Sequence, residues 1–326
     1  MKTYLLISFL SLATITFGQR DREIIKQIDD LNSSALRHYN NNRIAESFDE
    51  FSKSKVLSDS IEDLYGSAIA NFNLGNIYGV MQNQESAENC YKAMLLASEK
   101  INDNSLIAKS YLSLGTLYKT KKLKNKAVFY LEKALKHSFI DKNYVSDDYE
   151  QKEIKNTLFN IRINLSEVYI TNNQFEKALI PLLRIKNDSH ALDPYSLGYF
   201  NYVYGLYYTK KELYNNAELK FKSAIASLKF INSNDALILL SYSYKALSDI
   251  NYKIGNNELA YTNIVMHNNY KDKYLNEEKV KQDIITKSKF LIEDYKFNAD
   301  FANYNRLKQL EMTNNMKRIN IIITVT

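Results

Sequence analysis

Apolar residues recur every three or four positions along most of the chain, which is typical of amphipathic helices. Residues 105–137 show the pattern most clearly. Leu114 and Tyr118 share one face of a first helix, and Ala127 and Leu131 share one face of a second. A polar, lysine-rich stretch separates them. We therefore expect two helices joined by a short turn and packed antiparallel.

One phrase repeats along the chain: a small residue, an aromatic residue three positions later, and an alanine about nine positions after that. The small residues are Ala35, Gly75, Gly115, Ser166, Gly205 and Ser248, which lie 40, 40, 51, 39 and 43 residues apart. The copies at Gly75, Gly115 and Gly205 match the pattern well, those at Ser166 and Ser248 match it only in part, and the one at Ala35 is inferred. Such self-similarity predicts a stack of like units. Two antiparallel helices approach closely only where side chains are small, so we expect Gly115 and Ala127 to lie at the contact and Tyr118 to fill the space beside it.

The phrase resembles the tetratricopeptide repeat, a helix-turn-helix unit marked by Leu-Gly, a tyrosine three residues on, and a later Ala–aromatic–Ala. Residues 71–94, 111–134 and 201–224 match it well, and residues 162–185 and 244–267 match it with serine in place of glycine. The resemblance implies an all-α fold, an α-α superhelix of about six units over residues 19–270. Because the standard repeat has 34 residues, we expect helices longer by about a turn.

Three local features refine the expected helix ends. Asn104 or Ser105 is expected to cap its helix, and Asp193 to cap a helix with Pro194 in the first turn. Pro181 should loosen or kink its helix. The polar insertion at residues 137–150 is either a plain surface loop or a lip over a binding surface.

The start of the chain has the pattern of a signal peptide. Residues 1–18 combine Lys2, an apolar stretch to Phe17, and small residues at Thr16 and Gly18. Cleavage would leave a mature chain beginning at Gln19; the alternative is a retained N-terminal anchor. We expect an exported protein in the periplasm, either free or tethered to the inner membrane. Cys90 is the only cysteine, which rules out an internal disulfide, and we interpret it as a small residue facing the core.

The repeat pattern fades after residue 270. Residues 271–318 are predicted to form a helix that first caps the solenoid and then projects from it. Residues 319–326 form an apolar, β-branched run, a possible start of a truncated transmembrane segment. With this run, the chain resembles the exported sensory region of membrane-anchored bacterial regulators that carry an AraC-like or LuxR-like DNA-binding domain or a histidine kinase.

Composition, charge and motif spacing argue against several classes of function. The net charge of +6 is spread along the chain, so we expect no nucleic-acid binding by this chain. The lysine run at residues 119–126 is interpreted as a solvated turn. Four scattered histidines and the absence of phosphate-loop, nucleophile or metal-ligand spacing predict no metal site, no cofactor and no enzyme. The 26 tyrosines indicate either genomic base composition or an aromatic surface.

The resemblance implies a concave groove, lined by the first helix of each unit, that holds a protein or peptide. The residues expected to bind the partner flank the packing stripe; they are Asn76, Lys109, Thr116, Asn160, Asn164, Tyr199, Tyr202, Tyr242 and Lys245. The chain is thus interpreted as a non-enzymatic scaffold acting outside the cytoplasm. The alternative is the sensory region of a membrane-anchored regulator that has lost its output domain.

Overall fold

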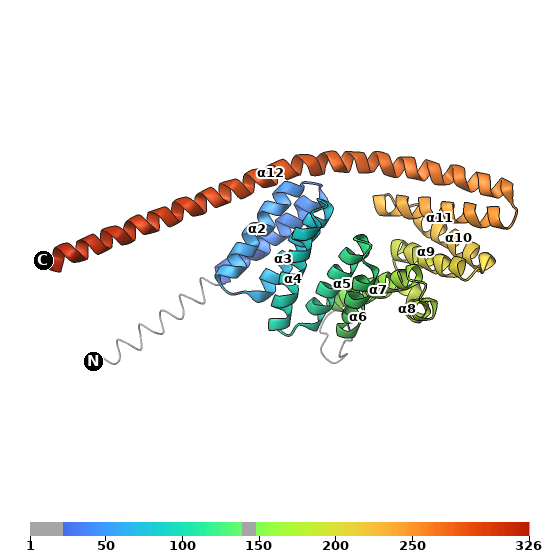
Figure 1. The fold of residues 1–326 in the computed structure, drawn as a ribbon, viewed down its shortest axis with the longest axis horizontal. Helices are drawn as coiled ribbons and strands as arrows, with labels where there is room; N and C mark the ends of the chain where they lie inside the picture. The colour runs from blue at the N-terminus through green and yellow to red at the C-terminus, as the bar shows by residue number, and fades with distance from the viewer. Residues whose placement is uncertain (1–21, 139–147, 326) are drawn as a thin grey trace. The chain divides into compact units, whose positions relative to one another are not determined.

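The computed structural model describes residues 22–138 and 148–325 (Figure 1). Within these residues all regular secondary structure is helical, which confirms the predicted all-α class. They divide into two compact units, one of residues 58–282 and one that joins residues up to 57 with those from 283.

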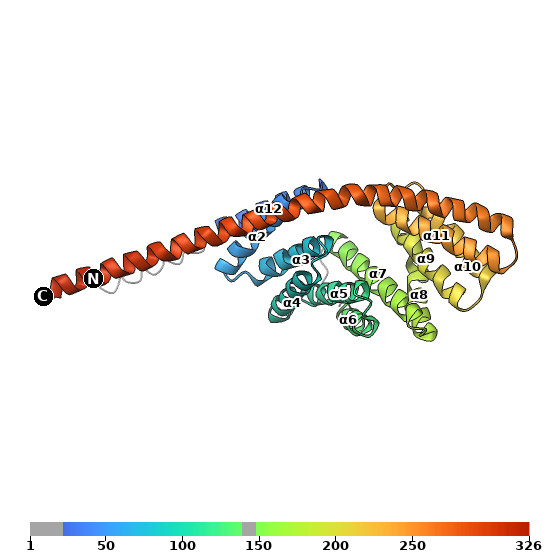
Figure 2. The same ribbon diagram turned by 45° about the horizontal axis from the view of Figure 1, so that its top comes forward.

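The larger unit is a series of antiparallel helix pairs (Figure 2). Its helices are α3 (Leu64–Val80), α4 (Gln84–Lys100), α5 (Asn104–Thr120), α6 (Lys124–His137), α7 (Asp148–Thr171), α8 (Phe175–Asp188), the 3-10 helix η1 (Ser189–Ala191), α9 (Pro194–Lys210), α10 (Tyr214–Leu228), α11 (Asn234–Lys253) and the first part of α12 (Asn257–Val325). We call α3, α5, α7, α9 and α11 the first helices, and the helix that follows each the second helix.

Eight turns between the described helices share one geometry. In each, one residue has a positive φ, and the N–H of the next residue bonds a carbonyl five positions back; Asn83 N–H, for example, donates to the Tyr78 carbonyl. This is a Schellman-type helix end. The positive-φ residues are Asn42, Glu62, Gln82, Asn102, Lys122, Asn173, Glu212 and Gly255. The first five are spaced 20 apart because 17-residue helices alternate with three-residue turns, which confirms the expected long helices.

Small residues allow the paired helices to touch. A Cβ added at Gly115 would lie 2.6 Å from Leu131 Cγ, and one at Gly205 would lie 2.8 Å from a ring carbon of Phe221. In both pairs the neighbour stands 16 residues later. Ala127 is fully buried. The expected close contact is therefore confirmed, with the large side chain of the second helix filling the glycine gap.

The helix ends correct one prediction and confirm another. Asp103, not Asn104 or Ser105, caps α5, since its carboxylate accepts the Leu106 N–H at 3.0 Å. Asp193 caps α9 with Pro194 in the first turn, as predicted.

Two further expectations concern Pro181 and the insertion. α8 runs as one helix through Pro181, which is buried, so the proline does not end the helix. Residues 148–150 of the insertion belong to α7, a helix of 24 residues, rather than to a loop. Residues 139–147 lie outside the described residues.

The smaller unit contains the helix of residues 22–40, most of α2 (Ile44–Ser60) and α12 from residue 283. Its core includes Ile28, Ala35 and Phe51. The Ser54 hydroxyl donates to Asn32 Oδ1 at 2.8 Å and joins the first two helices. The helix pair inferred at the front of the chain is therefore present.

α12 passes without a break through residue 270, the predicted end of the solenoid. Among the described residues, no helix has an apolar stretch sufficient to cross a bilayer. The predicted signal peptide lies outside the described residues. Cys90 is not disulfide-bonded and is only half-buried, so it fills the core less fully than expected.

Candidate functional site

The first helices of the larger unit form one layer. α3 contacts α5, α5 contacts α7, α7 contacts α9 and α9 contacts α11, while each second helix packs against the first helix of the following unit. Side chains on this layer can therefore reach from one unit to the next. Three groups of such side chains do so.

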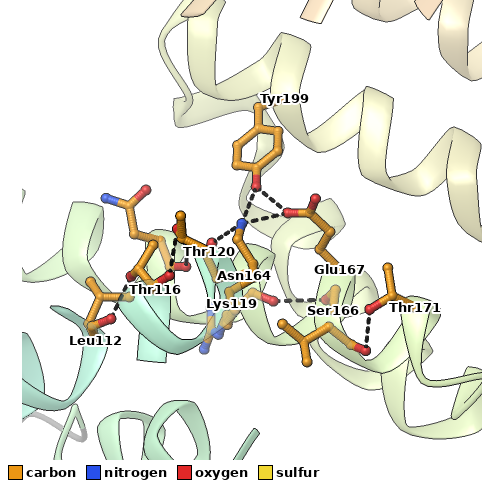
Figure 3. Close-up of polar contacts among 12 residues, drawn as sticks. Leu112, Thr116, Lys119, Thr120, Asn164, Ser166, Glu167, Thr171 and Tyr199 are labelled. Atoms are coloured by element: carbon orange, nitrogen blue, oxygen red, sulfur yellow. Dashed lines mark hydrogen bonds and ion pairs between the residues drawn. The ribbon is translucent and has the colours of Figure 1, made fainter. Parts of the chain in front are cut away.

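The first group centres on Lys119, near the end of α5 (Figure 3). Its ammonium donates to Asn164 Oδ1 at 2.6 Å and to Glu167 Oε2 at 2.8 Å, both on α7. It also donates to the Tyr199 hydroxyl on α9, at 3.3 Å. One cation thus links three consecutive units, and its three donors all have acceptors.

Tyr199 completes this Lys119 network by donating its hydroxyl proton to Glu167 Oε2 at 2.5 Å. Burial, and then the neighbouring Glu167 carboxylate, raise the pKa of Tyr199 well above its usual value. The phenol therefore stays protonated and acts as a donor at any physiological pH. The side chains of Lys119 and Glu167 are 27% and 25% exposed, so the ion pair is only partly withdrawn from water.

The second group joins the three first helices that precede α9. Lys109 on α5 forms an ion pair of 2.7 Å with Glu153 on α7. The same ammonium lies 4.6 Å from the ring centroid of Phe72 on α3. Lys109 is therefore held by neighbours on both sides.

The third group is aromatic. The rings of Tyr202 on α9 and Tyr242 on α11 stack with centroids 6.5 Å apart, and Tyr202 also touches the ring of Phe221. Burial raises the pKa of Tyr202. Tyr242 remains 48% exposed, so it presents a flat apolar face to the solvent.

The nine residues predicted to bind the partner divide between these groups and other positions. The structure brings together Asn164 with Tyr199, and Tyr202 with Tyr242. Lys109 joins neighbouring first helices by other contacts. Asn160 is exposed, and its carbonyl accepts from Asn164.

The other three predicted residues make contacts within their own units. Asn76 accepts from the Tyr91 hydroxyl at 2.8 Å. Thr116 donates to the Leu112 carbonyl one turn earlier (Figure 3). Lys245 pairs with Asp249 on the same helix, and both side chains are largely exposed.

Sequence reasoning missed Lys119 and Glu167. Lys119 was grouped with the following lysines as part of a solvated turn, yet it belongs to α5. The spacing held a signal: Lys109, Leu112, Thr116 and Lys119 follow at steps of three and four, which continues one helix face.

Two more lysines of the run also make contacts. Lys121 forms a 2.7 Å ion pair with Glu88 of α4, and Lys124 donates to the Thr171 carbonyl at 2.7 Å. Tyr118 donates its hydroxyl to Glu88 at 2.7 Å. The hydrogen bonds from Lys121 and then from Lys92 lower the pKa of Glu88 from 4.5 to about 2. Lys119 and Lys121 are thus partly buried and paired, whereas Lys122, Lys124 and Lys126 are exposed, as expected of a solvated turn.

An open hollow of about 380 Å³ lies beside the network, between the end of α5 and α7. It is lined by Lys119, Thr120, Lys122, Lys124, Glu167, Val168 and Thr171. Its volume suits a single side chain. Within the described residues, no group of histidine, cysteine or carboxylate side chains has the arrangement of a metal site.

The geometry agrees with the sequence comparisons. A tetratricopeptide-repeat family model matches residues 108–137, which cover most of α5 and all of α6. The chain has the tetratricopeptide-repeat fold. No curated protein resembles the sequence closely enough to count as a relative.

Several solved structures share the tetratricopeptide-repeat architecture of this chain. The apo form of RapI has a TM-score of 0.55 at 18% identity, over 78% of this chain and 85% of RapI. BtubC (BKLC) from P. vanneervenii has a TM-score of 0.53 at 16% identity, over 76% and 91%. PilW, a type IV pilus biogenesis factor, has 0.52 at 14% identity, over 72% and 90%. At these identities the likeness concerns the fold alone.

Proposed function

We propose that this tetratricopeptide-repeat chain is a non-enzymatic scaffold that binds an extended peptide or protein segment along its first helices. The supporting observation is the continuous layer of first helices, on which side chains of one unit contact those of the next. A ligand lying across this layer would meet residues from several units at once. Solenoids use such extended surfaces for binding.

The contacts of the nine predicted residues indicate two different roles, one structural and one in binding. Lys109, Asn164 and Tyr199 are held by other side chains, so they shape and stiffen the surface. Tyr242 and Asn160 are exposed. We propose that Tyr242 offers stacking area for an apolar or planar side chain and that Asn160 pairs with a peptide backbone group.

A random library of twelve-residue peptides tests this function. We expect the full chain to enrich a subset of sequences and Tyr242→Ala to weaken their binding at least about tenfold, as loss of a stacked aromatic does. Tyr252→Ala is the matched control, because Tyr252 lies on the same helix and is 73% exposed. Failure to enrich any peptide, or equal loss in both variants, would contradict the proposal.

We also propose that the chain acts outside the cytoplasm, on the strength of the signal-peptide pattern in residues 1–18. Mass spectrometry of the protein from its native host should find a mature N-terminus at Gln19. An intact Met1 terminus on a cytoplasmic protein would contradict export.

The sensory-region alternative rests on the apolar run at residues 319–326. It predicts that the native protein sediments with membranes and that the genomic reading frame continues past Thr326 into an apolar stretch of about twenty residues. A protein recovered wholly in the soluble periplasmic fraction would favour the stand-alone scaffold.

A further inference from the structure

Beyond residue 283, α12 has one buried face. Ile285, Ser288 and Ile292 are 2%, 5% and 1% exposed. The ammonium of Lys296 lies 5.3 Å from the ring centroid of Phe48 on α2. This face therefore belongs to the core of the smaller unit.

The other side of the same helix carries a stripe of exposed aromatic residues. Phe290, Phe297, Phe301 and Tyr304 are 70%, 67%, 57% and 61% exposed. On a helix they fall within about 60° of one another, on the side roughly opposite Ile285 and Ile292. The rings of Phe297 and Phe301 stack on each other with centroids 6.3 Å apart.

The aromatic stripe has the spacing of a coiled-coil seam. Its members are separated by seven, four and three residues, the steps between a and d positions of a heptad. Continued in both directions, the seam consists of Lys287, Phe290, Asp294, Phe297, Phe301, Tyr304, Lys308 and Glu311, all of which are exposed. A contiguous exposed row of this kind marks an interaction surface rather than an ordinary solvated face.

We propose that the aromatic stripe pairs α12 with α12 of a second copy of this chain, in an antiparallel arrangement with two-fold symmetry. Charge complementarity along the stripe is the reason for choosing a second copy of the chain as the partner. Two helices centred between Phe297 and Phe301 make four kinds of layer, each from opposite copies: Phe297 with Phe301, Asp294 with Tyr304, Phe290 with Lys308, and Lys287 with Glu311. Each layer occurs twice, as an isologous interface requires.

Each of these layers brings together side chains that attract one another. Two aromatic rings meet at the centre, and a tyrosine hydroxyl faces a carboxylate on either side. Further out, an ammonium faces an aromatic ring, and a lysine faces a glutamate at each end. Asp294 has a free carboxylate oxygen for the tyrosine, since its other oxygen accepts from Asn298 at 3.3 Å.

A parallel, in-register pair would be unfavourable at the same positions. It would set Lys287, Asp294, Lys308 and Glu311 each against its own copy, and like charges at seam positions specify against a pairing. In the antiparallel pair Asp300 approaches its own copy at the solvent edge, where salt screens the repulsion.

The interface has sufficient area. Aromatic side chains bury roughly 150–250 Å² each when fully enclosed, so the exposed parts of those from two copies amount to on the order of 1,000 Å². That is about the lower bound for a specific protein–protein interface.

Sedimentation of the full chain tests the pairing. We expect a dimer at micromolar concentration, and we expect the double variant Phe297→Glu, Phe301→Glu to dissociate at least about 100-fold more readily. Phe230→Glu is the matched control, because Phe230 is 86% exposed and lies on none of the seam positions. A monomeric wild-type chain, or a double variant that dimerises as well as the control, would overturn the proposal.

Charge exchange and cross-linking test the orientation. Lys287→Glu should weaken the dimer, and adding Glu311→Lys should restore it, whereas a parallel pair would keep its like-charge contacts. In a Cys90→Ala background, Lys287→Cys protein mixed with Glu311→Cys protein should form a disulfide-linked dimer that neither forms alone. Cross-linking of the Lys287→Cys protein with itself would show a parallel pair and refute the antiparallel arrangement.

Discussion

The glycines of α3 allow the packing argument to be tested within one helix. A Cβ added at Gly75 would lie 2.5 Å and 2.8 Å from two ring carbons of Tyr91, whereas one at Gly79 meets no atom closer than 4.0 Å. Both residues are helical, so alanine gains up to about 1 kcal/mol of helix propensity at either site. Only Gly75→Ala must also displace a neighbour.

The size of the effect follows from the contact. Carbon atoms rest about 3.5–4.0 Å apart, so the Tyr91 ring would have to move by about 1 Å. That ring is 7% exposed and its hydroxyl donates to Asn76, so it has little room. Overpacking of this kind costs about 1–3 kcal/mol. After the propensity gain of about 1 kcal/mol, we expect Gly75→Ala to lower the free energy of unfolding by up to about 2 kcal/mol.

Urea denaturation followed by circular dichroism measures the difference. Gly79→Ala should unfold at the same or a slightly higher urea concentration than wild type, and Gly75→Ala at a lower one. In a Tyr91→Ala background, Gly75→Ala should lower the free energy of unfolding by less than it does in the wild type, because the ring that the new methyl group meets is gone. If Gly75→Ala is as stable as Gly79→Ala, glycine is not required by the helix contact and the packing argument is wrong.

Three further predictions concern polar contacts. The pKa of Glu88 is lowered in the folded state, so its carboxylate stabilises the fold above pH 4.5, and this contribution is lost as the pH falls toward 2. Glu88→Gln should therefore lower the free energy of unfolding by about 1 kcal/mol at pH 7. The same variant should make that free energy less sensitive to acid. Asp103→Ala should destabilise by about 1 kcal/mol through loss of the cap, whereas Ser105→Ala should change stability by less than about 0.5 kcal/mol; equal effects would contradict the cap assignment. In a double-mutant cycle, Lys119→Met and Glu167→Gln should show a coupling energy of about 1 kcal/mol by thermal unfolding, and a value near zero would mean that the network does not join the units.

The fold was predictable because its packing signal is local and repeated. Gly115 and Ala127 stand at fixed places in a phrase that returns along the chain, and each copy faces the same steric requirement at the helix contact. The cap at Asp103 was less predictable, because Asp103, Asn104 and Ser105 are all capable caps. What decides between them is the positive φ of Asn102, which ends the turn one residue earlier.

The candidate site was only half predictable. Lys109, Asn164 and Tyr242 could be placed on the first helices from their spacing alone. The Lys119 network could not, because it depends on how far a flexible lysine reaches into two following units, 45 and 80 residues away. Spacing within one helix carries no information about that distance.

The 20-residue step from Asn42 to Lys122 has a consequence for how the chain can be divided. The turns within and between helix pairs share one geometry in this stretch, so the backbone of a turn does not show where a unit begins. The glycine contacts do, because Gly75 and Gly115 each pack against a residue of the second helix of their own pair. Fragments that keep a first helix with its second helix should therefore be the sound starting points for recombination, and a duplicated 40-residue block should lengthen the chain without a new kind of joint.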